Sequence, residues 1–358
     1  MRTLLKRTGT FLLFAAVAFC FAPSLVPPFL DRLYYRGPES GHFDGKRFFN
    51  PGFASHEGGS PRTFFNRWAT DNGRAEWPEH VPVIPTVPAR SVEGKEMRVI
   101  WIGHATVLIQ TEGLNILTDP VWSERASPFS FIGPKRVRAP GIRLEDLPRI
   151  DLIVISHNHY DHMDLPTLKL LWARDRPAII TSLGNDAILR DQGIEATALD
   201  WTEAAKVGPA RVIAERNHHW SSRWGTDRNR ALWSAFTIEL PGGNIFFAGD
   251  TGLGDGKWPL EAARGPVRLA ILPIGAYEPR DFMKTNHVNP EEAVRIFEML
   301  KPEAALAIHW GTFQLTFEPI DEPRQKLEAM KRARGIAPGR FVATEAGQVF
   351  SLPLPPAS

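Results

Sequence analysis

The sequence predicts an α/β layered fold from two observations. Short apolar runs typical of buried strands alternate with amphipathic segments typical of helices through most of the chain. A faint repeat also relates two stretches, Val107 to Asp119 and Phe236 to Asp250, because each reads as strand, glycine turn, strand and aspartate. Two similar half-sheets facing each other would produce such a repeat.

Regular structure is expected to begin at Met97. The first strands are predicted over residues 98–102, 106–110 and 115–118, with a turn at Glu112-Gly113 joining the second and third.

Two helices have recognisable starts. Asp164 is predicted to cap a helix with apolar residues at 165, 168, 171 and 172, and it tolerates Pro166 in its first turn. Asn289, Pro290 and Glu292 form the pattern of a capping box, which predicts a second helix from residue 290.

Composition excludes several functional classes. The chain has 358 residues, 43% hydrophobic and 23% charged, and its formal net charge of +2 gives no reason to expect a nucleic-acid partner. The single cysteine, Cys20, lies in an N-terminal apolar stretch. Cysteine nucleophiles, disulfides and Cys-rich zinc sites are therefore excluded from the folded domain.

Residues 1–30 are predicted to be a signal peptide or an uncleaved membrane anchor. Arg2, Lys6 and Arg7 precede the apolar run from Phe11 to Ala22, which is shorter than the roughly twenty residues of a full membrane span. We expect export, to the periplasm or beyond, or attachment to a membrane. Residues 31–95 are expected to form an irregular extension packed on the core, and residues 96–354 the main domain.

The most informative segment is His157-Asn158-His159-Tyr160-Asp161-His162, directly after the apolar run 152–155. Three imidazoles and a carboxylate so closely spaced at a strand end are typical of metal binding. The spacing separates two imidazoles from an Asp-His pair, which suggests two adjacent metal ions.

Further candidate ligands follow apolar runs elsewhere in the chain. His218 and His219 follow the run 210–214, Asp250 follows 245–248, and His309 follows 304–308. A strand would deliver each of these residues to one edge of a sheet.

These residues resemble the metallo-β-lactamase-fold hydrolases, which implies a four-layer αββα sandwich. Further motifs are similar to the N-acyl-phosphatidylethanolamine-hydrolysing phospholipase D branch, from Phe43 to the C-terminal strand. They are Phe43-Asp44-Gly45, Phe48-Phe49-Asn50-Pro51, residues 101–106 (WIGHAT), 273–277 (PIGAY), 287–293 (HVNPEEA) and 309–313 (HWGTF).

The resemblance implies a ligand set for two metals. The first is expected on His157, His159 and His219, the second on Asp161, His162 and His309, with Asp250 bridging. His218 is the alternative to His219, which the branch pattern favours because it is followed by Trp. Asp119 matches a position that orients the ligand loop. His104 and His287 are expected beside the metals or facing substrate.

Imidazole and carboxylate ligands suit Zn²⁺, although other divalent metals would also bind. Two such ions about 3.5 to 4 Å apart lower the pKa of a bridging water towards neutrality and take up charge on a phosphoryl or carbonyl oxygen. Asp161 is expected to orient this water as well as to bind metal.

The expected activity is a phosphodiesterase of phospholipase D type, acting on N-acylated phospholipids or small phosphodiesters at a membrane surface. A lactonase or carboxylic ester hydrolase is the first alternative, and a metal- or lipid-binding protein without turnover is the second. Two segments that mix cations with aromatics, 135–143 and 220–233, are candidates to contact phosphate and acyl chains. No particular oligomeric state is indicated.

Overall fold

The computed structural model describes residues 32–52, 66–67, 70, 73–262 and 264–352. The predicted signal peptide or anchor, residues 1–30, therefore lies outside the described residues. Within the described part, no helix is long and apolar enough to span a bilayer.

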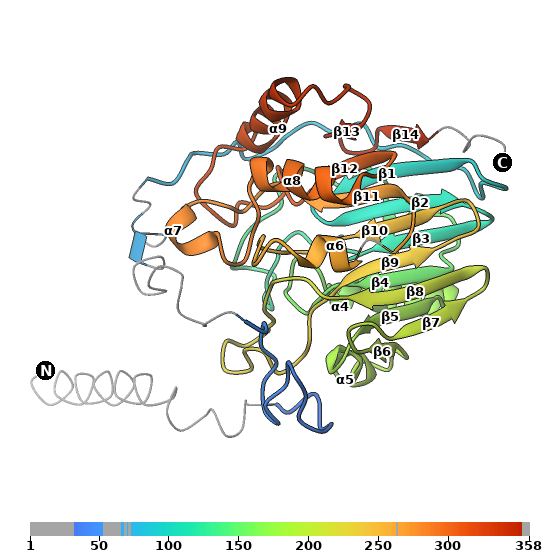
Figure 1. The fold of residues 1–358 in the computed structure, drawn as a ribbon, viewed down its shortest axis with the longest axis vertical. Helices are drawn as coiled ribbons and strands as arrows, with labels where there is room; N and C mark the ends of the chain where they lie inside the picture. Colours follow the sequence, from blue (N-terminus) through green and yellow to red (C-terminus); the bar gives the residue numbers. More distant parts are fainter. Residues whose placement is uncertain (1–31, 53–65, 68–69, 71–72, 263, 353–358) are drawn as a thin grey trace, which may run out of the picture.

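The first sheet has seven strands among the described residues, in the order β14-β1-β2-β3-β4-β5-β6 (Figure 1). β2 is antiparallel to β1 and β3, whereas β3, β4, β5 and β6 are parallel. The strands are β1 (Met97–Gly103), β2 (Thr106–Thr111), β3 (Leu114–Thr118), β4 (Leu152–Ile155), β5 (Ala178–Ser182), β6 (Thr197–Leu199) and β14 (Val349–Leu352).

The second sheet also has seven strands in the described part of the chain, in the order β13-β12-β11-β10-β9-β8-β7. They are β7 (Ala204–Val207), β8 (Ala210–Glu215), β9 (Ala235–Glu239), β10 (Asn244–Phe247), β11 (Val267–Pro273), β12 (Ala304–Ile308) and β13 (Phe341–Val342). β10 is antiparallel to β9 and parallel to β11, just as β3 is antiparallel to β2 and parallel to β4. The repeat in the sequence therefore corresponds to equivalent strands of two sheets.

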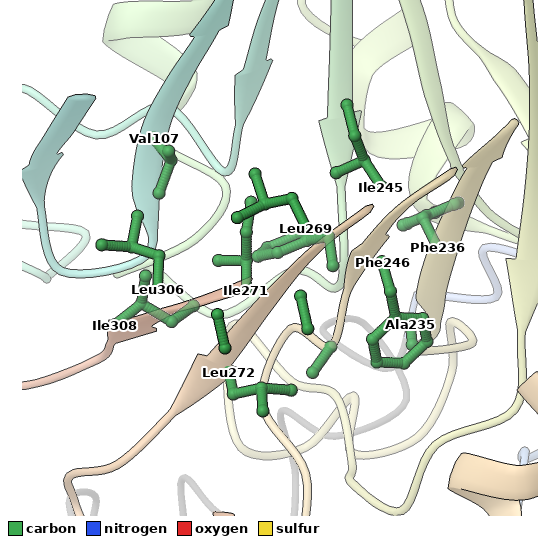
Figure 2. Packing of buried hydrophobic residues seen from close by; sticks show 14 of the residues in the cluster. Val107, Ala235, Phe236, Ile245, Phe246, Leu269, Ile271, Leu272, Leu306 and Ile308 are labelled. Atoms are coloured by element: carbon green, nitrogen blue, oxygen red, sulfur yellow. The ribbon is translucent and has the colours of Figure 1, made fainter. Parts of the chain in front are cut away.

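The two sheets pack face to face through apolar side chains (Figure 2). Val107 of the first sheet belongs to the same buried cluster as Phe236, Ile245, Leu269 and Leu306 of the second. Both faces of β4 are buried, and its side chains point to the two faces in turn. Leu152 and Val154 join the cluster between the sheets, whereas Ile153 and Ile155 join a second cluster on the other side of the first sheet.

Helices cover the outer faces. On the first sheet, Leu168 of α4 packs in the same buried cluster as Ile153 of β4. On the second sheet, α8 contacts β11, and Ile296 of α8 is buried in the same cluster as Leu269 of β11. The predicted four-layer αββα sandwich is thus confirmed. The described α-helices are α4 (Leu165–Asp175), α5 (Asn185–Arg190), α6 (Trp258–Ala262), α7 (Arg280–Met283), α8 (Pro290–Leu300) and α9 (Glu322–Ala333), and a 3₁₀ turn spans Leu144–Asp146.

One of the two predicted helix caps is correct. Asn289 Oδ1 accepts from the backbone N–H of Glu292 at 2.9 Å, and Glu292 accepts from that of Asn289 at 3.0 Å, which completes the capping box. Asp164 precedes α4, but its carboxylate makes no capping bond to the helix backbone. It accepts instead from the backbone N–H groups of Trp122 and Ser123, because the loop after β3 presents these donors beside it.

The described parts of the extension, 32–52 and 73–95, contain isolated bridges rather than long strands. Phe43 and Phe48 are buried against Leu232 and Trp233, so this segment contributes a small core of its own. The boundaries at residues 30 and 95 remain predictions.

Candidate metal centre

The candidate residues gather where strands of both sheets end. His157 to His162 follow β4, and Asp119 follows β3. Asp250 follows β10, His309 follows β12, and His219 comes four residues after β8. The carboxyl ends of strands running the same way meet at one edge of a sheet, which is where open α/β sheets hold their ligands.

Asp250 occupies the middle of the cluster. Its Oδ2 lies 3.0 Å from His309 Nε2, 3.1 Å from His162 Nε2, 3.7 Å from His219 Nε2 and 4.0 Å from His157 Nε2. One carboxylate oxygen is therefore close to imidazoles of both predicted metal sites.

The ligand atoms fall into two main groups of metal-binding size. His157, His159, His219 and Asp250 can place one ligand atom each within 4.8 Å of one another, and so can His104, Asp161, His162 and His309. These groups match the predicted assignment, with His104 added to the second. All seven predicted ligands thus lie together, although their metal-binding role remains a prediction.

The cluster suits a bound cation. His157 Nε2 and His159 Nδ1 lie only 2.7 Å apart, so two lone pairs directed at one ion would explain their approach. Within the described structure, the buried Nε2 atoms of His162, His219 and His309 and the Oδ1 of Asp250 take no hydrogen bond of good geometry. Buried donors and acceptors without partners are costly, and a metal would satisfy them.

Asp119 fixes the orientation of two of these imidazoles. Its Oδ2 accepts from His162 Nδ1 at 2.6 Å and from the hydroxyl of Ser156 at 2.6 Å. The Ser156 hydroxyl then lies 2.9 Å from His157 Nδ1 and can accept its proton. One carboxylate thereby leaves the Nε2 lone pairs of His157 and His162 free for metals in both groups. The role predicted for Asp119 agrees with these contacts.

The neighbouring histidines His218 and His219 bond to different backbone carbonyls, and only one of them lies in the cluster. His219 Nδ1 donates to the backbone carbonyl of Asn286 at 2.9 Å, which directs Nε2 towards Asp250. His218 Nδ1 bonds instead to the carbonyl of Thr285, and its ring packs against Gly254. His219 is the one that lies in the cluster.

His104 and His287 both border the cluster. His104 Nε2 is 2.8 Å from Asp161 Oδ2, and His287 Nδ1 is 3.9 Å from Asp250 Oδ2. His104, Asp119 and His309 all have left-handed backbone conformations, with φ of 55°, 33° and 63°. Such strain in non-glycine residues is typical of functional sites.

Burial keeps most of these imidazoles neutral, as metal ligation requires. Burial lowers the pKa of His159 and of His219 to about 3, and burial with the neighbouring His309 lowers the pKa of His104 to about 3. Burial would also lower the pKa of His162, but Asp250, Asp161 and Asp119 outweigh it and raise this pKa well above its usual value. In His309 the same competition raises the pKa to about 9, with Asp250 the main opposing charge.

The arginines predicted to contact phosphate have mostly structural roles. Three of them donate to backbone carbonyls and so hold the loops around the site. These bonds join Arg136 to Val121, Arg138 to Gly311, and Arg223 to Asn158 and Met163, at 2.8 to 3.0 Å. These bonds give the three arginines a structural role, and their contact with phosphate stays a prediction.

Ser156 and Asn286 were not predicted. Ser156 directly precedes the histidine motif, but its role depends on Asp119, which lies 37 residues away. Asn286 contributes a carbonyl, which any residue type supplies, so no sequence signal could have identified it.

The fold and site together define the class of protein. A family model described as "Beta-lactamase superfamily domain" matches residues 114–310, and the chain belongs to this superfamily of metallo-hydrolases. Its resemblance to the phospholipase D branch is also confirmed. N-acyl-phosphatidylethanolamine-hydrolyzing phospholipase D 1 of Caenorhabditis elegans is 36% identical over 331 residues, which are 86% of this chain and 93% of that protein.

A second relative is the mitochondrial N-acyl-phosphatidylethanolamine-hydrolyzing phospholipase D of Saccharomyces cerevisiae. It is 35% identical over 263 residues, which are 71% of this chain and 56% of the relative.

Solved structures share the fold alone. Igni18, a metallo hydrolase from Ignicoccus hospitalis, has a TM-score of 0.52 at 22% identity and covers 72% of this chain and 99% of its own. CmlA, a diiron β-hydroxylase from Streptomyces venezuelae, has a TM-score of 0.55 at 23% identity, and the match covers 73% of this chain and 54% of CmlA. Since the fold serves both hydrolysis and diiron oxidation, it does not by itself decide the metal.

Proposed function

We propose that the protein is a dinuclear zinc-dependent phosphodiesterase of phospholipase D type. The observation that carries the proposal is the position of Asp250 Oδ2, within 4.0 Å of ring nitrogens from both ligand groups. A single carboxylate oxygen placed in this way suits a bridge between two cations.

In this proposal, His157, His159 and His219 hold one ion, and Asp161, His162 and His309 hold the other. Bound zinc would supply an activated water at neutral pH and would offset negative charge on the substrate. The chain's own residues do the positioning. His104, neutral because of its burial, donates from Nε2 to Asp161 and fixes that carboxylate, while Asp119 fixes His157 and His162.

The proposed substrate is an N-acylated phospholipid, cleaved at the phosphodiester bond on the headgroup side. This choice rests on the two relatives named for hydrolysing N-acyl-phosphatidylethanolamine, one of which aligns along 93% of its length. Water would add to phosphorus and the headgroup alcohol would leave, so the products are a phosphate monoester and an N-acylated amino alcohol.

Asp161→Asn tests the site. The variant keeps the size of the side chain but weakens a charged ligand, so we expect loss of one metal per chain by elemental analysis. We also expect at least about a hundredfold lower kcat/KM on bis-p-nitrophenyl phosphate. Unchanged metal content together with unchanged turnover would refute the proposed mechanism.

The substrate panel separates the alternatives. N-acyl phospholipids and bis-p-nitrophenyl phosphate are assayed beside lactones and carboxylic esters with the same metal-loaded protein. Turnover of the phosphodiesters is expected, and turnover of lactones or esters alone would replace the proposal by an ester hydrolase. Bound metal without turnover of any of these compounds would indicate a binding protein.

We further propose that residues 1–30 export the chain or anchor it to a membrane, because Arg2, Lys6 and Arg7 precede the apolar run. Fractionation of cells expressing the full chain tests this. We expect the protein in the membrane or outside the cytoplasm, and a uniformly cytoplasmic protein would contradict it.

A further inference from the structure

Arg228 differs from the other arginines of the predicted contact segment 220–233. Arg223 donates to two backbone carbonyls at 2.9 Å, and Arg230 donates to the carbonyl of Lys46 at 2.7 Å. The guanidinium of Arg228 has no hydrogen-bond or ion-pair partner among the described residues, and the residue is exposed. Its N–H donors are therefore available to a ligand.

Trp220 places this guanidinium beside the candidate metal centre. The Cζ atom of Arg228 lies 4.1 Å from the ring centre of Trp220. The same indole lies edge to face against the imidazole of His159, with 4.2 Å between the ring centres. A predicted metal ligand and an unpaired cation thus contact one indole. Stacking on an aromatic face leaves the edge of a guanidinium free to donate to an oxyanion.

The turn that carries Arg228 is held from two sides. Within the turn, the buried carboxylate of Asp227 accepts from the hydroxyl of Ser222 at 2.7 Å and from the backbone N–H of Trp224 at 2.9 Å. From the N-terminal extension, the guanidinium of Arg47 donates to the backbone carbonyl of Arg228. The position of Arg228 is therefore fixed before a ligand arrives, which lowers the entropic cost of binding one.

The charges around Arg228 favour an anion. Partial burial of its guanidinium lowers the pKa of Arg228, the positive charge of Arg47 lowers it further, and no acidic group in the described part of the chain raises it. Asp44 lies beside Arg47, but its Oδ1 already accepts from the backbone N–H groups of Lys46 and Arg47 at 2.8 and 2.6 Å. An oxyanion bound at Arg228 would relieve the repulsion between the two guanidinium groups.

We propose that Arg228, stacked on Trp220, forms an oxyanion subsite for a carboxylate on the headgroup of the substrate. Two divalent ions would already offset the single negative charge of a phosphodiester, so a separate cation beside them suits a second anionic group. The planar edge of a guanidinium matches a carboxylate through two parallel N–H···O bonds.

This inference deepens the proposed function and rests on it for the class of substrate. It narrows that class to N-acylated phospholipids with an acidic headgroup. The simplest example is N-acyl phosphatidylserine, in which the serine nitrogen is acylated and the carboxylate is free.

Two matched lipids test the subsite in the full, metal-loaded chain. N-acyl phosphatidylserine and its carboxyl methyl ester differ in the charge of the headgroup, and both are presented in micelles of a neutral detergent. We expect the wild type to prefer the acid about tenfold in kcat/KM. The difference should lie mainly in KM, because the carboxylate does not react. Equal kcat/KM values for the two lipids would overturn the proposal.

Variants of Arg228 identify the source of this preference. Arg228→Gln should lower kcat/KM for the acid to that for the ester, whereas Arg228→Lys should keep part of the preference, since the charge remains without the planar fork. A preference for the acid that persists in Arg228→Gln would overturn the proposal. An equal loss of turnover on both lipids in that variant would indicate a structural role and would overturn it as well.

The matched control is Arg176→Gln. Arg176 is also exposed and also stacks on a tryptophan, with its Cζ atom 4.8 Å from the ring centre of Trp172, but it follows α4 away from the histidine cluster. Arg176→Gln should keep the full preference for the acid. If both variants lost it equally, the effect would come from the overall charge of the protein, and the subsite would be refuted.

Binding without turnover separates this inference from the proposed function. Calorimetric titration of Asp161→Asn with short-chain, soluble forms of the two lipids should show about tenfold tighter binding of the acid, and adding Arg228→Gln should remove the difference. Equal binding of the two lipids would overturn the subsite and leave the proposed function intact. Failure of the wild type on all phosphodiesters, with the difference in binding preserved, would contradict the function alone.

Discussion

Asp119 contacts both halves of the candidate centre, directly through His162 and through Ser156 to His157. In Asp119→Asn, an amide would replace one acceptor and favour the wrong tautomer of His162. We expect metal affinity to fall about 10- to 100-fold, measured by competition with a chelator.

The control for this prediction is Asp164→Asn. Asp164 is also buried and also holds a loop, through Trp122 and Ser123, but it does not contact the histidines. Loss of stability without loss of metal affinity is expected there. Equal metal affinities in the two variants would show that Asp119 does not orient the ligands.

Metal binding should release protons at neutral pH. The raised pKa values of His162 and His309 mean that these imidazoles hold protons in the metal-free protein, and ligation requires them neutral. Calorimetric titration with Zn²⁺ in buffers of different ionisation enthalpy should reveal release of about one proton or more per chain. Identical heats in all buffers would contradict this assignment.

The stability of the metal-free fold should also depend on pH through His309. The pKa of His309 is raised from 6.5 to about 9, so its stabilising contribution is complete below the unfolded value and is lost as the pH rises through about 9. Thermal unfolding of the chelated protein should therefore shift to lower temperature across this window. In His309→Gln the shift should be smaller, and an identical shift would argue against His309 as its source.

At this scale the sequence predicted much of the site. The ligand types and their position after apolar runs agree with the structure, because strand ends determine where such residues lie. The choice of His219 over His218 also agrees with it, but that choice came from the resemblance to the branch pattern, since both residues follow the same strand. The sequence could not predict which arginines bind carbonyls, since Arg136 and Arg223 find their partners only after distant loops meet.

The capping box of α8 is the clearest case in which local sequence determines an element. Asn289→Ala removes the acceptor for the N–H of Glu292, so we expect a loss of about 1 kcal/mol in the free energy of unfolding. Chemical denaturation measures it. Asp321→Ala is the matched control, because Asp321 precedes α9 without a side-chain capping bond and should cost much less. Equal costs would contradict the capping argument.

Strand positions were predictable for the same local reason, and β1, β2 and β3 begin within one residue of their predicted starts. The failure of Asp164 as a backbone cap illustrates the limit. Its residue type and position fit a cap, but loop donors from Trp122 and Ser123 compete for the same carboxylate, and sequence spacing does not reveal them.

At the largest scale, the two sheets meet at the candidate metal centre. Asp119 and the histidine motif come from the first sheet, and His219, Asp250 and His309 come from the second. The faint repeat predicted two related sheets, yet the order of strands within them depends on long-range pairing that the repeat does not specify.

Because its ligands come from both sheets, bound metal should stabilise the whole fold. Zn²⁺ at about a hundred times its dissociation constant would contribute about 2.7 kcal/mol per site. Differential scanning calorimetry should show a lower Tm with chelator and recovery when Zn²⁺ is restored. A Tm unaffected by chelation would mean that the cluster does not link the sheets through metal.

The most direct test of the central claim is product analysis of N-acyl phospholipid hydrolysis in isotopically labelled water. Purified, metal-loaded protein is incubated with vesicles, and the lipids are resolved by mass spectrometry, with Asp161→Asn as control. The account predicts an N-acylated amino alcohol and a phosphate monoester that carries the labelled oxygen. Label in a released fatty acid, with the phosphodiester intact, would contradict it.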